Sequence, residues 1–433
     1  MRRARAVPDA PHIGPKVPKK PRSSPYLSVV ATTRNDNHGG NLTRRTQHFV
    51  NGFVAQCCRH HLFAELILVE WNPPSDRRPL IEELSWPAES GSCEIRIVTV
   101  PRAIHARFAH ADKLPLFQMI AKNVGIRRSR GEFVLATNID ILFSDEIIRF
   151  MLDRLTPGNL YRADRRDIPE NVPESASFDE ILDFCRREHF RINANSYTAV
   201  RSATRWSRIE LIKVWAPSKV RYIARLLIEL ITVRAPSRLR SYFKWFTDPG
   251  SVGNRQISFK GELLRGLGIR LSSILRRAPT AIAHARKLLL EPLLHTNACG
   301  DFTLLARADW FALRGYPEWH IFSWHVDSVF LYQANRSGIM EKYVGRGARI
   351  FHIEHETGSG FTPNGAQKLF ARISAHGLPY ITDDEFVKLV AEMDERKHAG
   401  EPVIYNTENW GLADVDLPEV ALHSKGPPRT MPN

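Results

Sequence analysis

The sequence predicts an α/β fold built on a mixed, mostly parallel sheet that helices cover. Short apolar runs recur through the first third of the chain, and segments with helical spacing separate them. Polar residues follow these runs, as expected at the carboxyl edge of such a sheet, where ligands bind. The chain has 433 residues, 43% of them hydrophobic and 25% charged, which is typical of a globular protein with a large core.

The first predicted unit is a strand, a helix and a second strand. The apolar run 27–31 predicts a buried strand, and a polar turn with two glycines follows it at 32–40. Apolar residues between 42 and 57 recur at helical spacing, and the run 66–69 predicts the next strand. The second strand is closed by Glu70.

The alternation continues with a third strand at 95–100, a helix from about 114 to 128 and a fourth strand at 133–136. Asp140 follows the fourth strand at the ligand edge of the predicted sheet. Ser144 is the expected N-cap of another helix.

Changes in composition divide the rest of the chain, although the charged stretch 161–200 shows no clear periodicity. A third composition, rich in Trp, His and Gly, begins near residue 294. We therefore expect a disordered basic tail at 1–25, a first half of the α/β domain at 26–200 and a basic, mostly helical insertion at 201–293. A second half of the domain at 294–402 and a loosely ordered C-terminal tail at 403–433 follow.

Positive charge is concentrated in the predicted insertion. The net charge of the chain is +15, and residues 201–290 contain 19 Lys/Arg against four Asp/Glu. Apolar residues between 222 and 231 share a helical face, which Arg221 and Arg225 flank, so this segment could dock on an anionic membrane surface. A helical subdomain that packs on the enzyme body is the alternative, and a nucleic-acid-binding surface is a third interpretation. No recognised nucleic-acid motif accompanies the charge, so we expect no nucleic-acid partner.

The five cysteines show no paired spacing, which indicates neither a disulfide framework nor a zinc ribbon. No apolar stretch is long enough to span a membrane or to act as a secretory signal. We therefore expect a cytoplasmic protein, peripheral on the inner membrane face if the insertion docks there.

Asn138-Ile139-Asp140 is the first motif that carries chemistry. A carboxylate at the end of a strand could bridge a divalent cation such as magnesium or manganese to a diphosphate. The tripeptide could equally be a turn that caps the next helix.

The N-terminal part resembles family-two glycosyltransferases of the GT-A fold. The resemblance rests on residues 26–37, on the helix 121–126 with its Lys-Asn-x-Gly sequence, and on Gly131-Glu132 leading to 138–140, where Asn138 replaces the usual first Asp. It implies that Asp140 binds a divalent metal. It also implies nucleotide-binding roles for Thr32, Arg34, Glu70, Lys122, Asn123 and Asn138.

The segment 300–327 resembles the acceptor part of galactosyltransferase-type enzymes. Matching from Gly315 places Asp327 on the family's general base, while Val326 stands where Glu is usual. The resemblance implies that a late histidine, His355 or His352, completes the metal shell. Trp310, Trp324 and His325 are candidate acceptor-binding residues, although core packing is the alternative for the tryptophans and hydrogen-bonded structure for the histidine pair.

Together these resemblances imply a hexosyltransferase-like enzyme that moves a sugar from a nucleotide-diphosphate sugar to a glycan or lipid-linked acceptor, as in polysaccharide or glycolipid biosynthesis. An inverting transfer needs a base for the acceptor hydroxyl, here Asp327, and a divalent cation to neutralise the leaving diphosphate. A basic nucleic-acid-binding protein and a catalytically silent GT-A scaffold are the alternatives.

Overall fold

The computed structural model describes residues 23–195, 197–201, 206–210, 294–345, 347–355 and 363–422. The predictions for the basic tail up to residue 22, for nearly all of the insertion at 201–293 and for residues 423–433 lie outside the described residues.

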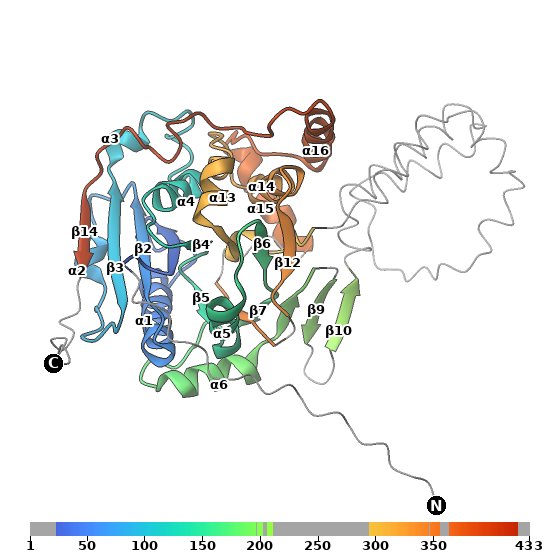
Figure 1. Cartoon of the computed structure of the whole chain (residues 1–433). Helices are drawn as coiled ribbons and strands as arrows, with labels where there is room; N and C mark the ends of the chain where they lie inside the picture. Colours follow the sequence, from blue (N-terminus) through green and yellow to red (C-terminus); the bar gives the residue numbers. More distant parts are fainter. Residues whose placement is uncertain are drawn as a thin grey trace, which may run out of the picture.

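A central sheet of eight strands has the order β12-β6-β11-β4-β1-β2-β3-β14 (Figure 1). Its strands are β1 Leu27–Thr33, β2 Ala64–Trp71, β3 Cys93–Val100, β4 Phe133–Ala136, β6 Asn159–Arg162, β11 Thr303–Ala306, β12 Met340–Tyr343 and β14 Glu419–Leu422. β1 pairs in parallel with β2 and β4, β2 with β3 and β12 with β6, whereas β11 and β14 run antiparallel to their neighbours. The predicted mixed, mostly parallel sheet is therefore confirmed.

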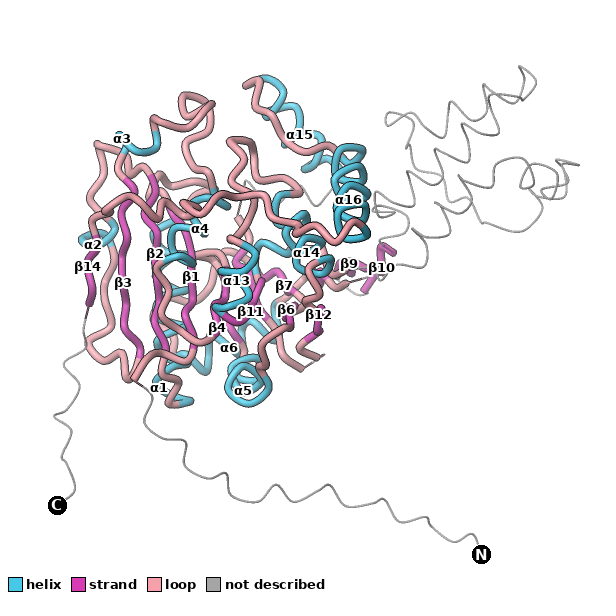
Figure 2. The backbone as a smooth tube through the Cα atoms, turned by 45° about the horizontal axis from the view of Figure 1, so that its top comes forward, coloured by secondary structure: helices cyan, strands magenta, loops and turns pink. Residues whose placement is uncertain are grey.

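Alternating side chains of this sheet feed two separate cores. Val30 packs with residues of α4, α13 and α14, whereas Val29 and Ala31 pack with residues of α1 and α5. Helices thus cover both faces of the central sheet, and Figure 2 shows the strands that lie between them. The bounds of these helices are α1 Leu42–His60, α4 Gln118–Arg127, α5 Asp145–Arg154, α13 Arg307–Leu313 and α14 Val326–Arg336.

A second sheet has six strands in the order β10-β9-β8-β7-β13-β5. It consists of β5 Ile141–Phe143, β7 Arg165–Ile168, β8 Arg191–Asn193, β9 Tyr197–Arg201, β10 Trp206–Glu210 and β13 Ile350–Ile353. Together with β6 and α6 Phe178–Glu188, its strands β7 to β9 account for the stretch that the sequence left without elements. β5 and β13 come from the two predicted halves of the enzyme, so the halves share both sheets.

The chain beyond residue 402 is ordered as far as residue 422, in contrast to the loosely ordered tail that its composition predicted. Trp410 is 1% exposed within the larger core, and β14 adds to the edge of β3. An aromatic anchor and a short antiparallel strand therefore hold this segment on the body of the protein.

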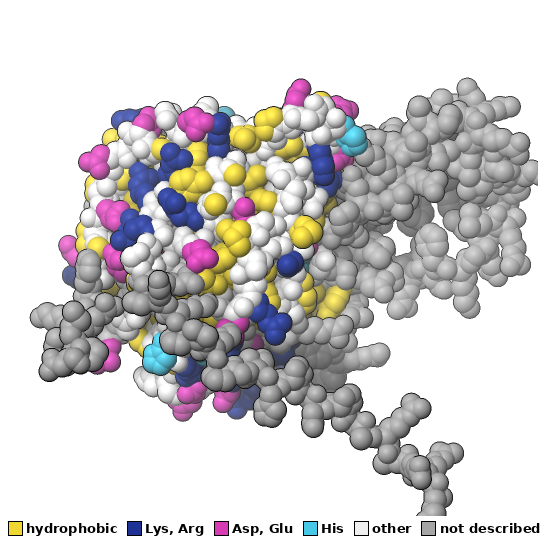
Figure 3. Space-filling view, viewed as in Figure 1, with side chains coloured by type: hydrophobic (Ala, Val, Ile, Leu, Met, Phe, Trp, Pro, Cys, Tyr) yellow, Lys and Arg dark blue, Asp and Glu magenta, His cyan; other side chains and the backbone are white. Residues whose placement is uncertain are grey.

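The remaining elements of the described residues are short or peripheral. They are α2 Leu80–Glu83, α3 Arg102–His105, the 3-10 turn η2 Cys299–Asp301, α15 Pro363–Ala375 and α16 Asp383–His398. None of the described helices is long and apolar enough to cross a membrane. On the face shown in Figure 3, basic and acidic side chains are interspersed rather than gathered by sign.

Candidate metal centre and active site

Asp140 lies in the link between β4 and β5, at the carboxyl end of a central strand, and is 5% exposed. Its Oδ2 atom accepts a hydrogen bond of 3.0 Å from Arg45 Nη1. The Nε2 atoms of His355 and His352 lie 3.4 Å and 3.7 Å from the same oxygen. The buried Oδ1 atom has no hydrogen-bond partner among the described residues. Two imidazoles thus converge on a carboxylate that has one oxygen to spare.

Strand pairing brings the two histidines to Asp140. β13 runs antiparallel to β5 with His352 opposite Ile141, and the N–H of Ile353 donates to the Asp140 carbonyl at 2.9 Å. His355 follows two residues after the end of β13. The other ring nitrogen of His352, Nδ1, lies 3.3 Å from Asp167 Oδ1. A carboxylate behind an imidazole is the usual outer partner of a metal-binding histidine, because it fixes the ring and its tautomer.

These residues meet the first requirements of a divalent metal site. One ligand atom from each of Asp140, His352 and His355 lies within 4.8 Å of the others. Two imidazole nitrogens with one carboxylate suit manganese, zinc or another transition metal better than magnesium, which prefers oxygen ligands alone. Asp167 and Glu354 form a second group with His352. Asp167, however, already accepts hydrogen bonds from other side chains, so it lies behind His352 as an outer partner and not as a ligand.

Charge balance keeps the central carboxylate ionised. Burial raises the pKa of Asp140, but His352, His355 and Arg45 together hold that pKa well below its usual value. Burial and Arg165 lower the pKa of His352, whereas Asp140 and Asp167 raise it above its ordinary value overall. A cation that binds here therefore has to displace the proton that these carboxylates favour on His352.

Arg45 is a site residue that the sequence did not reveal. It lies in the first turns of α1, is 3% exposed, and donates from Nε and Nη2 to the Gly40 carbonyl at 3.2 and 3.0 Å. Within an amphipathic helix an arginine looks like any surface residue, so no local signal marks it.

Asp301 links the metal centre to the second half of the chain. Its Oδ1 accepts a bond of 2.5 Å from Asn138 Nδ2, its Oδ2 accepts one of 2.7 Å from Arg165 Nη1, and its carbonyl accepts one of 2.7 Å from Thr137 Oγ1. The Asn138 amide oxygen in turn accepts from Gln118 at 3.0 Å. Asn138 therefore holds the 3-10 turn against the end of β4.

Asp327, the predicted general base, lies in the first turn of α14 and is partly exposed. Its Oδ1 accepts the N–H of Ser328 at 2.8 Å. Its Oδ2 is 3.1 Å from the point where a Cβ at Gly300 would stand. A glycine at position 300 thus leaves room for this carboxylate beside the turn that carries Asp301.

Lys122 lies beside the turn at Gly300, on which Asp327 also borders. It is fully buried in α4, and its Nζ donates to the Gly300 carbonyl at 2.6 Å. Burial lowers its pKa to about 8, against the opposing pull of Asp301, Asp327 and Asp140. Asp327 and Lys122 thus border the same turn, and Asp140 is close enough to act electrostatically on the ammonium group.

The predicted nucleotide-binding residues Thr32, Arg34 and Glu70 gather at the ends of β1 and β2. Glu70 pairs in register with Thr33, and its Oε1 accepts the N–H of Leu80 at 2.8 Å. Burial raises its pKa, although hydrogen bonds from Leu80 and Thr99 oppose that rise. The Thr32 hydroxyl is buried without a described partner, and Arg34 donates to Asp36 at 2.9 Å.

Asn123 has a structural task in the fold. Its Nδ2 donates to the Tyr316 carbonyl at 2.8 Å and to Glu318 Oε1 at 2.9 Å, while its Oδ1 accepts the Tyr316 N–H at 2.9 Å. A side chain so fully bonded to its own protein has little to offer a nucleotide.

The three predicted acceptor residues lie in different settings. Trp310 has no exposed surface, stacks on Phe330 and donates from Nε1 to the Val134 carbonyl at 3.0 Å, so it belongs to the core. His325 precedes α14 in a left-handed conformation, and its Nε2 lies 2.9 Å from Asp383 Oδ1. Trp324 is half-buried beside it. Only Trp324 and His325 thus lie near Asp327 at the helix start.

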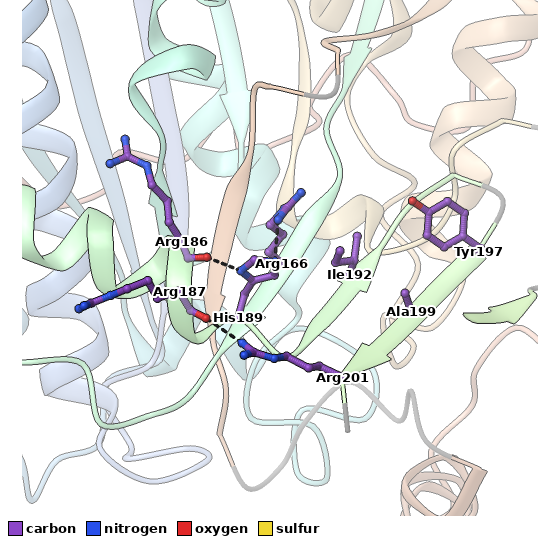
Figure 4. Close-up of a pocket in the computed structure, with 8 residues that line it drawn as sticks. All are labelled: Arg166, Arg186, Arg187, His189, Ile192, Tyr197, Ala199 and Arg201. Atoms are coloured by element: carbon purple, nitrogen blue, oxygen red, sulfur yellow. Dashed lines mark hydrogen bonds between the residues drawn. The ribbon is translucent and has the colours of Figure 1, made fainter. Parts of the chain in front are cut away.

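A cavity of about 670 Å³ lies away from this cluster, between α6 and the strands β7 to β9 (Figure 4). Arg166 lines it, whereas its neighbours Arg165 and Asp167 face the opposite side of β7 toward the metal centre. In Figure 4 the guanidinium groups of Arg186 and Arg187 point to the left, away from Tyr197, which lies at the right. The cavity is therefore separate from the candidate active site.

No protein-family model matches the sequence, and a search of curated proteins gives no match. Solved structures to which the chain is similar include GalNAc-T7, crystallised with UDP, GalNAc and Mn2+, and S. aureus TarS 1-349 in complex with UDP. The TM-score with GalNAc-T7 is 0.37 at 12% identity, over 88% of this chain and 59% of that chain. For TarS the TM-score is 0.33 at 10% identity, over 86% and 72%. The chain therefore spans less than two thirds of GalNAc-T7.

Proposed function

We propose that the protein is a metal-dependent glycosyltransferase of the GT-A type that transfers a sugar from a nucleotide-diphosphate sugar to an acceptor hydroxyl, with inversion. The single observation that carries this proposal is a carboxylate-histidine cluster that the 299–301 turn connects to a second carboxylate. Asp140, His352 and His355 form the cluster, and Asp327 is the second carboxylate, across the turn at Gly300.

In this proposal Asp140, His352 and His355 hold the divalent cation. When bound, the cation supplies positive charge to the diphosphate as it leaves. Manganese fits better than magnesium because two of the three donors are imidazole nitrogens. The unpartnered Oδ1 atom of Asp140 supports the fit, because a buried carboxylate oxygen without a hydrogen bond is costly unless a ligand compensates it.

Asp327 accepts the proton of the acceptor hydroxyl. It is the carboxylate in the first turn of α14 that stands beside Lys122, partly open to the outside. Trp324 and His325 precede it in the chain and are the proposed acceptor contacts. The acceptor class, a glycan or a lipid-linked sugar, stays part of the proposal.

The nucleotide lies against the ends of β1 and β2 in this proposal. Thr32, Arg34 and Glu70 would face the base and ribose, and Lys122 the diphosphate side near the metal centre. The side chains of Asn123, Asn138 and Trp310 are bonded within the protein, so none of them is a proposed ligand contact. Glu70 can accept a hydrogen bond from a base N–H, which both uracil and guanine offer.

A thermal-shift screen of nucleotide sugars, with and without manganese, tests the proposed function. A donor that binds only the folded protein raises its melting temperature, and manganese should increase that shift. Asp140→Ala should abolish the manganese-dependent part, whereas Asp414→Ala, which removes an exposed carboxylate, should keep it. Equal manganese-dependent shifts in all three proteins would show that Asp140 holds no cation for the donor.

Docking on an anionic membrane remains a separate proposal for the basic insertion, which lies outside the described residues. Its support is the excess of Lys/Arg in 201–290, since basic residues near an acidic surface each contribute on the order of 1 kcal/mol to binding. Co-sedimentation with anionic vesicles should fall with salt and on deletion of the insertion. Equal recovery on neutral vesicles would rule the docking out.

A further inference from the structure

The loop between β1 and α1 places a third histidine, His38, beside His355. Within this loop the backbone turns through left-handed conformations at Asn37, Gly39, Gly40 and Asn41. His38 lies at the middle of the turn with its side chain exposed, and its N–H donates to Asp36 Oδ1 at 3.1 Å. The loop thus presents an imidazole from a tightly folded backbone.

One side chain fixes this backbone against the metal carboxylate. Arg45 Nη2 donates to the His38 carbonyl at 2.5 Å, while Nη1 of the same guanidinium donates to Asp140 Oδ2 at 3.0 Å. Because a guanidinium is planar and rigid, the spacing between the His38 backbone and Asp140 is set by a single group. The histidine is therefore held at the edge of the cluster.

The ring positions fit a shared ion. The ring centroids of His352 and His355 are 5.4 Å apart, and those of His38 and His355 are 6.4 Å apart. Two imidazoles bound to one ion through nitrogens about 2.1 Å from it have centroids roughly 4.5 to 6.5 Å apart, depending on the angle at the ion. Both pairs fall within this range, the His38–His355 pair at its upper end, where the two nitrogens lie on nearly opposite sides of the ion.

We propose that His38 is a fourth protein ligand of the cation held by Asp140, His352 and His355. This inference rests on the metal centre of the proposed function. Three imidazoles and one carboxylate make a donor set for a transition-metal ion such as manganese, and they disfavour magnesium. Binding of the ion also fastens the β1–α1 loop, which begins beside the proposed nucleotide-binding residue Arg34.

Direct measurement of manganese binding to the full chain tests this assignment without any sugar donor. Titration followed by electron paramagnetic resonance should give an affinity for the wild type that falls about tenfold or more in His38→Ala, since loss of a supporting group at a metal typically costs that much. His398→Ala, an exposed histidine at the end of α16, is the matched control and should bind like the wild type. The nitrogen couplings in the spectrum of the bound ion should indicate three coordinated imidazoles in the wild type and two in His38→Ala.

Asp140→Ala separates the two levels of the proposal. If this variant binds manganese as tightly as the wild type, the metal centre is wrong and the proposed function loses its cation. If Asp140→Ala loses the ion while His38→Ala keeps wild-type affinity and three nitrogen couplings, only the assignment of His38 is overturned. Loss of affinity in both variants, with His398→Ala unchanged, supports the fourth ligand.

Discussion

Neighbouring groups compensate the buried negative charge of Asp140 even when no cation is bound. Arg45 donates to one of its oxygens, and two imidazoles stand close to the same oxygen. An uncompensated buried charge would be strongly destabilising, so these groups let the chain fold before any ion arrives. A cation held there as proposed would exchange a proton and part of a guanidinium contact for coordination.

Asp327→Asn is expected to leave donor binding intact and to remove most of the transfer. The amide has nearly the shape of the carboxylate but cannot accept the proton of the acceptor hydroxyl, and general-base catalysis typically contributes about 10²-fold or more. Donor affinity from thermal shift and turnover with a matched acceptor would be measured together. Turnover near that of the wild type would exclude Asp327 as the base.

The buried Lys122 predicts how the stability of the protein depends on pH. Its pKa is lowered to about 8 in the folded protein, against roughly 10.4 in the unfolded chain. Between these two values the unfolded chain binds a proton at Lys122 that the folded protein does not. The contribution of Lys122 to the free energy of unfolding therefore rises as the pH rises from 8 toward 10.

The comparison that isolates this effect is between the wild type and Lys122→Met. The free energy of unfolding of the wild type, relative to that of the variant, should increase from pH 8 to pH 10 in denaturant titrations. Parallel curves over this interval would mean that the lysine titrates normally.

The sequence made Asp140, Asp327 and the two histidines visible because each lies in a recognisable local motif. Arg45, Arg165 and Asp301 escaped for a physical reason, since each acquires its role only from a partner far away in the chain. Arg165 and Asp301 are 136 positions apart and meet as a buried ion pair at 2.7 Å. No spacing rule predicts such a pair.

At the scale of elements, α4 joins the two halves of the chain. Its Asn123 binds the turn at Tyr316, its Lys122 binds the turn at Gly300, and its Gly125 lets it approach β1 closely. A Cβ at Gly125 would lie 2.4 Å from a methyl of Val30. The helix therefore positions the turn beside Asp327 as well as packing on the sheet.

Gly315→Ala tests the joint between α4 and the turn that follows α13. Gly315 has φ +69°, and a Cβ there would lie 2.4 Å from Asn123 Oδ1. The free energy of unfolding of the variant should fall by about 1 to 3 kcal/mol, the usual cost of an overpacked site. The cost of an alanine in a left-handed backbone conformation adds to this loss.

Gly338→Ala supplies the control for that experiment. Gly338 has φ +89°, and no described atom lies within 4 Å of the point where its Cβ would stand, so this substitution reports backbone strain alone. Equal losses of stability in the two variants, from denaturant unfolding, would contradict a tight joint at Asn123.

Elements were predictable where apolar residues recur in long, regular runs. The first four strands and the α5 helix with Ser144 as its N-cap agree with the sequence. The second sheet was not predicted, because strands such as β7 bury Arg165 and Asp167 as paired charges and so look like exposed chain. β14 is short and mostly exposed, and only its pairing with β3 makes it a strand.

At the scale of the whole molecule, distant segments complete one another. The final described segment covers the outer strand β3 and inserts Trp410 beside α4 and α13. Arg128 of the first half donates to the carbonyls of Gly411, Leu412 and Val415. The C-terminal segment therefore belongs to the fold rather than trailing from it.

Trp410→Ala should lower the free energy of unfolding by about 3 to 5 kcal/mol, the range for truncating a large buried aromatic side chain. Met340→Ala is a suitable control, because Met340 is 61% exposed and its truncation should cost little. Thermal and denaturant unfolding of both variants would be compared. A loss no larger than in the control would mean that the segment contributes nothing to the core.

The position of β11 sets an order of events on the ribosome. This strand fills the place between β4 and β6, although it is synthesised long after both. At about 5 to 20 residues per second, the nascent chain exposes the unpaired edges of β4 and β6 for roughly 10 to 30 seconds before β11 emerges. During that interval the unfinished sheet is open to pairing with other nascent chains, so we expect its yield in cells to depend on chaperones that shield those edges.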